Sequence, residues 1–295
     1  MSGLSKKATI LGIAFVILSW SLTWPISKIG LHYSPPLLFA GMRTLLGGIL
    51  LAIFLSNRIR ELQWKKNWRI FVVSALFNVI IFIASSNFAL KYLPSGLYTV
   101  ILYSQPVLVV LLSWLWLKES MTVRKLTGIL LGFFGVLIVS FKGLNGYVSL
   151  VGILLALISA LGWTFGTVYV KKNNEKVHWL WLVAMQNLIG GIFMTCSGLL
   201  TEDAYSIEWK PPLILSLFYG GVIALGVATA VYNKLMSVGE SSKVASFTFL
   251  VPVLAVGIGS IFLGEDFTIS IFGGLVLIFA SIYLINSKKH RNKNE

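Results

Sequence analysis

The chain has 295 residues, a formal net charge of +14 and 57% hydrophobic residues, whereas charged residues make up only 12%. This composition excludes a water-soluble fold, because the apolar runs are too long and too frequent for a core surrounded by water. The chain is therefore predicted to be an all-α, polytopic membrane protein. Its positive charge does not indicate a nucleic-acid partner, since basic residues beside membrane spans usually report orientation.

Ten apolar segments, each near the ~20 residues that cross a bilayer core, are predicted as transmembrane helices. Helices are expected because backbone polar groups in lipid must be satisfied within the segment, and the alternating pattern of a barrel strand is missing. The predicted spans are residues 8–29, 36–55, 68–90, 95–117, 123–141, 150–170, 179–200, 212–236, 243–263 and 267–285.

The distribution of basic residues predicts the orientation of these spans. Of the 24 Lys and Arg residues, nineteen fall on the side of the N-terminus in the ten-helix arrangement, four fall on the other side, and Arg43 lies within a span. Cytoplasmic connections carry an excess of Lys and Arg, so both termini are predicted to be cytoplasmic. The expected location is the cell (plasma or inner) membrane, with the lipid bilayer as partner.

The chain contains an internal repeat. Residues 87–119 match residues 233–265 without a gap, and each copy holds a Pro-Val-Leu-x-Val segment that begins at Pro106 or Pro252. Two halves of five helices each follow from this match, and because five is odd the second half must enter the membrane inverted. Inverted repeats are a hallmark of secondary transporters, whose substrate site lies near the bilayer midplane between the halves.

The ten spans, the two Pro-Val-Leu-x-Val segments and the helices that end on Glu119 and Glu265 resemble the EamA-like branch of the drug/metabolite transporter superfamily. The resemblance covers essentially the whole chain. It implies two inverted five-helix repeats, residues 1–146 and 147–295, around a central cavity lined by helices 1, 3, 4, 6, 8 and 9. Members of this family typically export amino acids or other small metabolites, and some move nucleotide sugars or sugar phosphates.

Groups that would support other chemistry are missing from the spans. No predicted span has Asp or Glu in its interior, and His32, His178 and His290 lie in connections or the tail. Proton relays usually rest on buried carboxylates or histidines, so passive exchange is expected, or coupling through a site that the sequence does not reveal. An intramembrane enzyme would need a nucleophile with its base or clustered metal ligands. No enzyme activity, metal ion or cofactor is therefore expected.

Aromatic and uncharged polar side chains recur inside the spans, and polar groups are costly when they face lipid. Trp20 and Trp24 share one face of the first span, and Trp163 and Thr167 share one face of the sixth. We expect these side chains to line a cavity in which rings pack the apolar part of a solute and amides hold its polar end. The predicted substrate-binding residues are Trp20, Trp24, Arg43, Asn78, Ser85, Tyr98, Gln105, Trp163, Thr167 and Gln186.

Three of these assignments leave alternatives open. Tryptophans can instead anchor helices at the interface and amides can bond neighbouring helices, although the deep, repeat-related Trp20 and Trp163 favour the cavity. Arg43 could receive a carboxylate or phosphate of the substrate, or it could snorkel outward as a structural group. Its counterpart in the second half is Gln186, which indicates that the fold itself does not need the charge.

Pro106 and Pro252 are predicted to lie mid-helix, where each removes a backbone hydrogen bond and forms either a hinge or a static bend. The favoured function is a carrier that exports a small metabolite, first of all an amino acid or similar amphiphile, by alternating access. The alternatives are a sugar-phosphate or nucleotide-sugar exchanger, which would need more basic groups, and a receptor or scaffold without transport. Glycines in the fifth and tenth spans favour packing within the bundle over a homodimer.

Overall fold

The computed structural model describes residues 5–93, 98, 101–140, 149–239, 241–254 and 269–286. Every regular element among these residues is helical; η2 and η5 are π-helical, and η1, η4 and η6 are 3-10 helices. The elements are α1 (Lys6–Leu31), α2 (Pro36–Phe54), η1 (Ser56–Leu62), α3 (Trp64–Ala75), η2 (Leu76–Ala84), α4 (Ser85–Tyr92), α6 (Gln105–Leu117), α7 (Val123–Ser140), α8 (Leu150–Asn173), α9 (Trp179–Thr201), η4 (Ala204–Ser206), α10 (Pro211–Phe218), η5 (Tyr219–Ala228), α11 (Thr229–Val238), α12 (Ser241–Ser246), η6 (Phe247–Phe249) and α14 (Ile269–Asn286).

The all-α membrane class predicted from the composition is confirmed. Six helical stretches of the described chain are long and apolar enough to cross a membrane, judged by length and composition. They are Lys7–Leu31, Pro36–Phe54, Trp64–Tyr92, Leu150–Asn173, Trp179–Thr201 and Pro211–Val238. The fourth, ninth and tenth predicted spans contain shorter apolar helices, and part of each of these spans lies outside the described residues, as does the predicted helix end at Glu265.

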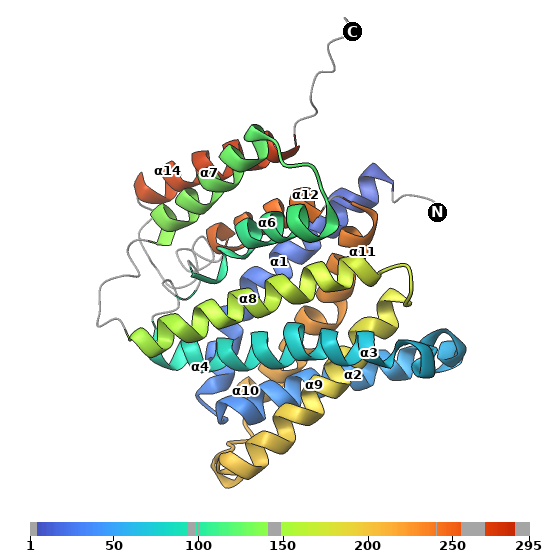
Figure 1. The fold of residues 1–295 in the computed structure, drawn as a ribbon. Helices are drawn as coiled ribbons and strands as arrows, with labels where there is room; N and C mark the ends of the chain where they lie inside the picture. Colours follow the sequence, from blue (N-terminus) through green and yellow to red (C-terminus); the bar gives the residue numbers. More distant parts are fainter. Residues whose placement is uncertain are drawn as a thin grey trace, which may run out of the picture.

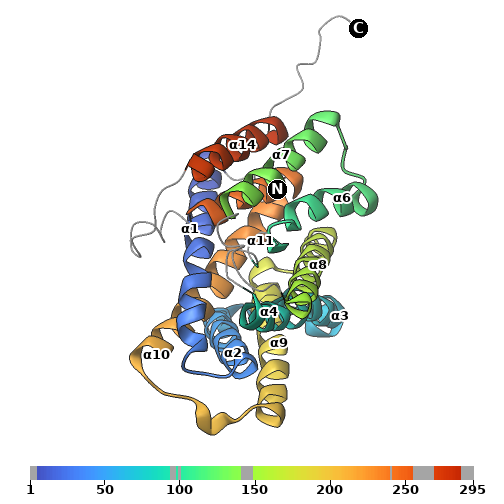
Figure 2. The same ribbon diagram turned by 90° about the vertical axis from the view of Figure 1, so that its left-hand side faces the viewer.

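Helices from the two halves of the chain interleave in one bundle. Helix α2 packs along α9, and α8 lies against η2, α4 and α6, while α1 lies against η5, α10 and α11. Helices α7 and α14 form a closely packed pair, which Figures 1 and 2 show at one edge of the bundle. Glycines of the fifth predicted span allow this close packing, since a Cβ on Gly135 would meet the Ile278 side chain at 2.7 Å, whereas a Cβ on Gly273 of the tenth span would meet nothing within 4 Å.

Two long helices change their winding in the middle. The stretch Trp64–Tyr92 runs through α3, η2 and α4, and the stretch Pro211–Val238 runs through α10, η5 and α11. In each, a π-helical segment of 9 or 10 residues separates two α-helical ends. A π-helix bonds residue i to residue i+5 instead of i+4, so side chains four apart come closer to one line than they do in an α-helix. This change decides which residues of these helices face inward.

The two prolines predicted to lie mid-helix differ in their positions. Pro252 lies inside the helical stretch Lys243–Leu254, three residues after the 3-10 segment η6. Pro106 is in the first turn of α6, directly after a turn at Tyr103 and Ser104, so its mid-helix position was wrong. The physical reason is that proline lacks the N–H that a helix interior needs, whereas the first turn has no intrahelical acceptor for that group.

The N-terminus of α2 is capped by a residue from a distant part of the chain. Pro35 at the N-cap position offers no side-chain acceptor, which leaves the first N–H groups of α2 unpaired. The Glu202 carboxylate at the end of α9 accepts hydrogen bonds from the backbone N–H groups of Leu37 and Leu38, both at 2.9 Å. A negative charge at this position also interacts favourably with the helix dipole.

We expect Glu202→Ala to destabilise the bundle by about 1–2 kcal/mol, because two N–H groups of α2 lose their acceptor and the helix dipole loses its anion. The measurement is the melting temperature of the purified protein in detergent. Glu208→Ala is the matched control, since among the described residues that half-exposed carboxylate pairs with the exposed Lys210 side chain alone. Such a surface pair contributes at most about 1 kcal/mol. Equal melting temperatures for the two variants would refute the capping role.

Candidate functional site

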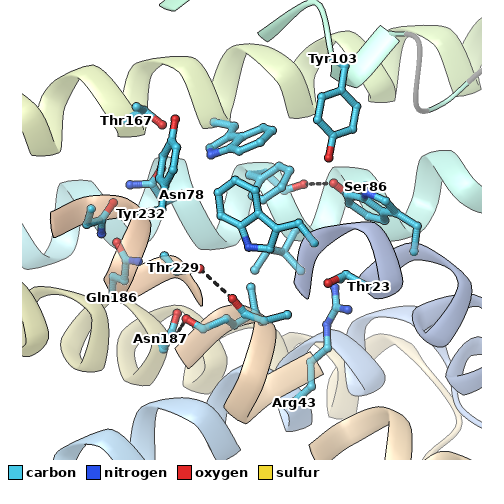
Figure 3. Close-up of a pocket in the computed structure, with 18 residues that line it drawn as sticks. Thr23, Arg43, Asn78, Ser86, Tyr103, Thr167, Gln186, Asn187, Thr229 and Tyr232 are labelled. Atoms are coloured by element: carbon cyan, nitrogen blue, oxygen red, sulfur yellow. Dashed lines mark hydrogen bonds between the residues drawn. The ribbon is translucent and has the colours of Figure 1, made fainter. Parts of the chain in front are cut away.

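A cavity lies inside the bundle, and residues from both halves of the chain line it. The space free of atoms between its lining residues amounts to about 770 Å³, part of which is open to solvent. Figure 3 shows its lining side chains converging from α1, α2, η2, α4, α8, α9, η5 and α11. The lining residues are Trp20, Thr23, Trp24, Arg43, Asn78, Phe82, Ile83, Ser86, Tyr103, Trp163, Thr167, Gln186, Asn187, Ala224, Leu225, Thr229, Tyr232 and Asn233.

Aromatic rings form one wall of the cavity, with Trp163 of α8 at its centre. The Trp163 ring stacks on Phe82 at 5.1 Å between centroids and meets Trp20 edge-on at 5.3 Å. Tyr103 and Tyr232 complete the group at 6.3 and 6.5 Å from Trp163. Such offset and edge-to-face pairs fix the rings in place, and they present apolar faces to a bound molecule.

Hydroxyl groups support the wall from behind. Tyr98 is fully buried and donates its hydroxyl hydrogen to Ser86 Oγ at 2.7 Å, while its ring packs edge-on against Trp24 at 5.0 Å. Ser86 Oγ also lies 2.7 Å from Ser159 Oγ on α8, and Ser159 donates to the Phe82 carbonyl at 3.1 Å. This network joins α4 and η2 to α8, so it holds two sides of the cavity in register.

Amide groups face the cavity from the other side. Ser74 Oγ donates to Gln186 Oε1 at 2.5 Å and accepts from Asn78 Nδ2 at 3.3 Å, which links η2 to α9. Asn187 Nδ2 donates to the Leu225 carbonyl in η5 at 3.1 Å. In Figure 3, Asn78, Gln186 and Asn187 lie on the side of the cavity opposite Tyr103 and Ser86. These bonds orient the amides and leave part of their polar capacity for a solute.

Arg43 brings the one formal charge among the described lining residues. Its side chain is only 2% exposed, so it does not snorkel to the surface as one alternative proposed. Nη1 donates to Ser27 Oγ at 2.6 Å, Nη2 donates to Asn87 Oδ1 at 3.4 Å, and the guanidinium carbon lies 5.1 Å from the centre of the Phe39 ring. Nε has no hydrogen-bond partner, and no Asp or Glu among the described residues pairs with this arginine.

Other buried polar atoms around the cavity also lack hydrogen bonds of normal geometry. Asn233 Nδ2 makes none, Trp24 Nε1 lies near the Tyr103 hydroxyl without forming one, and the Tyr232 hydroxyl lies near Thr167 without forming one. The fully buried Gln105 lies beside the Tyr232 hydroxyl without forming a hydrogen bond of normal geometry. An unpaired buried polar group costs free energy. A cavity lined by several such groups is therefore suited to a ligand that brings its own polar atoms.

The structure brings seven of the ten residues predicted for the site together in one lining: Trp20, Trp24, Arg43, Asn78, Trp163, Thr167 and Gln186. Tyr98 and Gln105 lie just behind it. Ser85 does not reach the cavity, and its neighbour Ser86 takes the place. The prediction of Ser85 assumed a helix of 3.6 residues per turn from Asn78 onward, but the π-helical winding of η2 moves the inward line by one residue.

The resemblance implied that helix 8 lines the cavity, but no residue of that span was among those predicted for the site. In the structure this span contains η5 and α11, which add Thr229, Tyr232 and Asn233 to the lining. One signal was available, because Asn233 is the repeat partner of Asn87, the residue that bonds Arg43. Helices α2 and α9, which are the second and seventh predicted spans, also line the cavity, although the resemblance implied neither of these two spans. The ninth predicted span, which the resemblance did imply, supplies no lining residue among those described.

One end of the cavity walls is fastened by a lysine. Lys171 near the end of α8 donates to the carbonyl oxygen of Met236 at 2.6 Å and to that of Gly239, and Asn174 Nδ2 donates to the Ser237 carbonyl at 3.1 Å. A cation at the carbonyl end of a helix satisfies unpaired acceptors and complements the dipole. These bonds tie α8 to α11, the helices that carry Trp163 and Tyr232 respectively.

A multi-pass helical membrane protein whose halves enclose an aromatic and amide-lined cavity is built as transporters are. The model of the EamA-like transporter family matches the chain twice, over residues 7–141 and again over residues 150–287. The chain belongs to the EamA-like transporter family, and it is a membrane transporter and not an enzyme.

Named relatives match along almost their full length. The chain is 46% identical over 293 residues to Uncharacterized transporter YvbV of Bacillus subtilis (strain 168), covering 99% of this chain and 96% of that protein. It is 30% identical over 290 residues to a Probable amino-acid metabolite efflux pump of Escherichia coli (strain K12), covering 95% of each. A solved structure titled "Crystal structure of protein" superposes with a TM-score of 0.83 over 96% of this chain and 97% of that one. Its 19% identity supports the fold alone.

Proposed function

We propose that the protein exports a small metabolite, first of all an amino acid or a similar amphiphile, by alternating access through the central cavity. The observation that carries this proposal is the lining itself: a wall of rings faces a set of amide and hydroxyl groups inside one membrane bundle. A solute with an apolar body and a polar end would satisfy both sides. The relatives named as amino-acid metabolite efflux pumps add support.

In this proposal each predicted residue except Ser85 has a defined task. Trp20, Trp24 and Trp163 pack the apolar body, and Asn78, Thr167, Gln186 and Arg43 hold the polar end. Tyr98 and Gln105 support the lining from behind. Pro106 and Pro252 are proposed hinges, because each lies shortly after a change in the winding of its helix and neither supplies a backbone N–H that bending would free: Pro106 follows a turn, and Pro252 follows the 3-10 segment η6.

The proposed topology is ten transmembrane helices in two inverted repeats, residues 1–146 and 147–295, with both termini in the cytoplasm. The double match to the family model and the asymmetric distribution of Lys and Arg support it. The test is labelling of single cysteines in place of Glu119 and Glu265 by an impermeant thiol reagent in intact cells, with Cys196 replaced by Ser. Glu265 is expected to be reached and Glu119 protected. Equal labelling of both positions would refute the inversion.

Transport is tested with the purified protein in liposomes, supplied in turn with amino acids and with phosphorylated sugars. Uptake of an amino acid down its gradient is expected. The phosphorylated-sugar alternative has less support, because a doubly charged phosphate calls for several basic groups and Arg43 is the only Lys or Arg among the described residues of the lining. Uptake of phosphorylated sugars alone would reverse this ranking. Uptake of neither class would favour the receptor or scaffold alternative.

A further inference from the structure

We propose that Arg43 binds the carboxylate of the transported solute and thereby selects solutes that carry one. This inference rests on the proposed function, because it assigns the substrate group that the same cavity recognises. It distinguishes carboxylates from amines and neutral amphiphiles of the same size, which the aromatic wall by itself would accept equally well.

The positive charge of Arg43 in the bundle interior is not balanced by a negative charge among the described residues. Arg43 is 2% exposed, and its partners Ser27 and Asn87 are both neutral. The Phe39 ring at 5.1 Å offsets part of the charge, but a ring has no net negative charge. Charged groups inside a membrane protein normally pair with an opposite charge or face a functional cavity. Since no Asp or Glu of the described residues pairs with Arg43, the opposite charge is left for the solute to supply.

The Arg43 side chain is directed into the space between the helices and is fixed there by hydrogen bonds. Figure 3 shows the Arg43 side chain extending from α2 toward Thr23 of α1, into the space between the helices. Asn87 is fixed in turn by a bond from its Nδ2 to the Pro36 carbonyl at 3.3 Å, so the oxygen that accepts from Nη2 is held in place. A guanidinium positioned in advance loses less freedom when it binds a planar carboxylate.

Two hydrogen-bond donors at the cavity are not fully used. Arg43 Nε is a buried donor without a partner, and the buried Trp24 Nε1 lies near the Tyr103 hydroxyl without a hydrogen bond of normal geometry. Both residues line the cavity. Neither nitrogen can act as an acceptor, so a group that satisfies them must accept hydrogen bonds. A carboxylate offers two acceptor oxygens and the negative charge together.

Helix packing does not require the charge of Arg43. Gln186 of α9 is the repeat counterpart of Arg43, and it is equally buried at 1% exposed. It is neutral and bonds Ser74 at 2.5 Å. The same place in the other half of the bundle is thus filled by an uncharged side chain, which leaves the charge of Arg43 free for recognition.

The test compares ligands that differ only at the proposed contact. Binding of leucine, leucinamide and isocaproate to the purified protein is measured by the change in tryptophan fluorescence, and the other amino acids are measured in pairs with their carboxamides. At least one acid is expected to bind roughly 30-fold or more tightly than its amide, since an unpaired buried Arg is costly. Isocaproate, which keeps the carboxylate and lacks the amine, is expected to compete with leucine if leucine is bound.

Variants then locate this discrimination. Arg43→Gln is expected to bring the acid-to-amide ratio to within about 3-fold, and Arg43→Lys to leave an intermediate ratio because it keeps the charge without the planar fork. Arg69→Gln, which removes an exposed positive charge from α3, is the matched control and should leave the ratio unchanged.

The outcomes separate this inference from the proposed function. Acids and amides that bind equally well to the wild-type protein would overturn the inference even if Arg43→Gln failed to fold. A ratio that persists in Arg43→Gln, or equal weakening of acid and amide, would assign Arg43 to helix packing and would also overturn it. In each of these cases liposome uptake of an amino acid would leave the proposed function standing, whereas the absence of any binding and uptake would refute both.

Discussion

Trp163→Ala is expected to lower the initial rate of solute uptake into liposomes by at least about 10-fold at low substrate concentration. The Trp163 ring lies at the centre of the aromatic wall, with Phe82 stacked on it at 5.1 Å and Trp20 edge-on at 5.3 Å. Removing it deletes one stacking surface for the solute and releases the neighbouring rings, each contact contributing about 0.5–1.5 kcal/mol. Together these losses exceed the ~1.4 kcal/mol that correspond to a tenfold change.

Two further variants show whether this loss belongs to the cavity. Trp163→Phe keeps a ring at the same place and should retain most of the uptake, although it lacks the indole N–H as Trp163→Ala does. Trp114→Ala removes a tryptophan that is 48% exposed on α6, outside the lining, and should transport like the wild-type protein. Unchanged uptake by Trp163→Ala, or equal losses in Trp163→Ala and Trp114→Ala, would contradict a solute site at this wall.

Gly47→Ala is expected to destabilise the protein by at least about 1–3 kcal/mol and to impair transport. A Cβ on Gly47 would lie 2.2 Å from the carbonyl oxygen of Gly221, so α2 and η5 would have to move apart. The same contact is close from the other side, since a Cβ on Gly221 would lie 2.2 Å from the Arg43 carbonyl oxygen. Overpacking of this kind is costly because backbone cannot yield as a side-chain end can.

The readouts are the melting temperature in detergent and the uptake rate. Arg43 lies one turn from Gly47 on α2, so separation of the helices also displaces its guanidinium, and a small misplacement is enough to lower the rate. Gly273→Ala on α14 is the matched control, because a Cβ there would meet nothing within 4 Å. That variant should keep or slightly raise the melting temperature, as alanine favours a helix over glycine. Equal effects of the two substitutions would disprove the close contact of α2 with η5.

The candidate site could be predicted in part because the cost of exposing an indole or an amide group to lipid depends on the side chain itself and not on its neighbours in the fold. Indole and amide groups are costly in lipid, so Trp20, Trp163 and Gln186 had to turn inward whatever the neighbouring helix was. Ser85 was predicted wrongly because a regular helical period was assumed, and the sequence of η2 gives no sign of π-helical winding. That winding depends on how η2 packs against α8 and α9, which a local pattern does not contain.

Tyr232 and Asn187 show a second limit. Asn187 lies in α9, whose apolar residues are spread around the whole helix, so hydrophobic periodicity does not indicate a face that turns inward. Tyr232 lies in α11, which with 10 residues is too short for such a pattern to be read. Their place in the lining follows from the crossing of α11 and α9 with the other helices, and such crossings are set by close backbone contacts like that of Gly47 with Gly221.

The sequence by itself determined that this chain is a helical membrane protein, because the free energy of moving apolar and charged groups between water and lipid depends on composition and run length alone. It also carried the resemblance to the transporter family and the solitary charge of Arg43. The tertiary structure decided where that charge lies, which donors around it stay unpaired, and which side chains of each half meet. Those outcomes depend on contacts between helices far apart in the chain, and no local pattern encodes them.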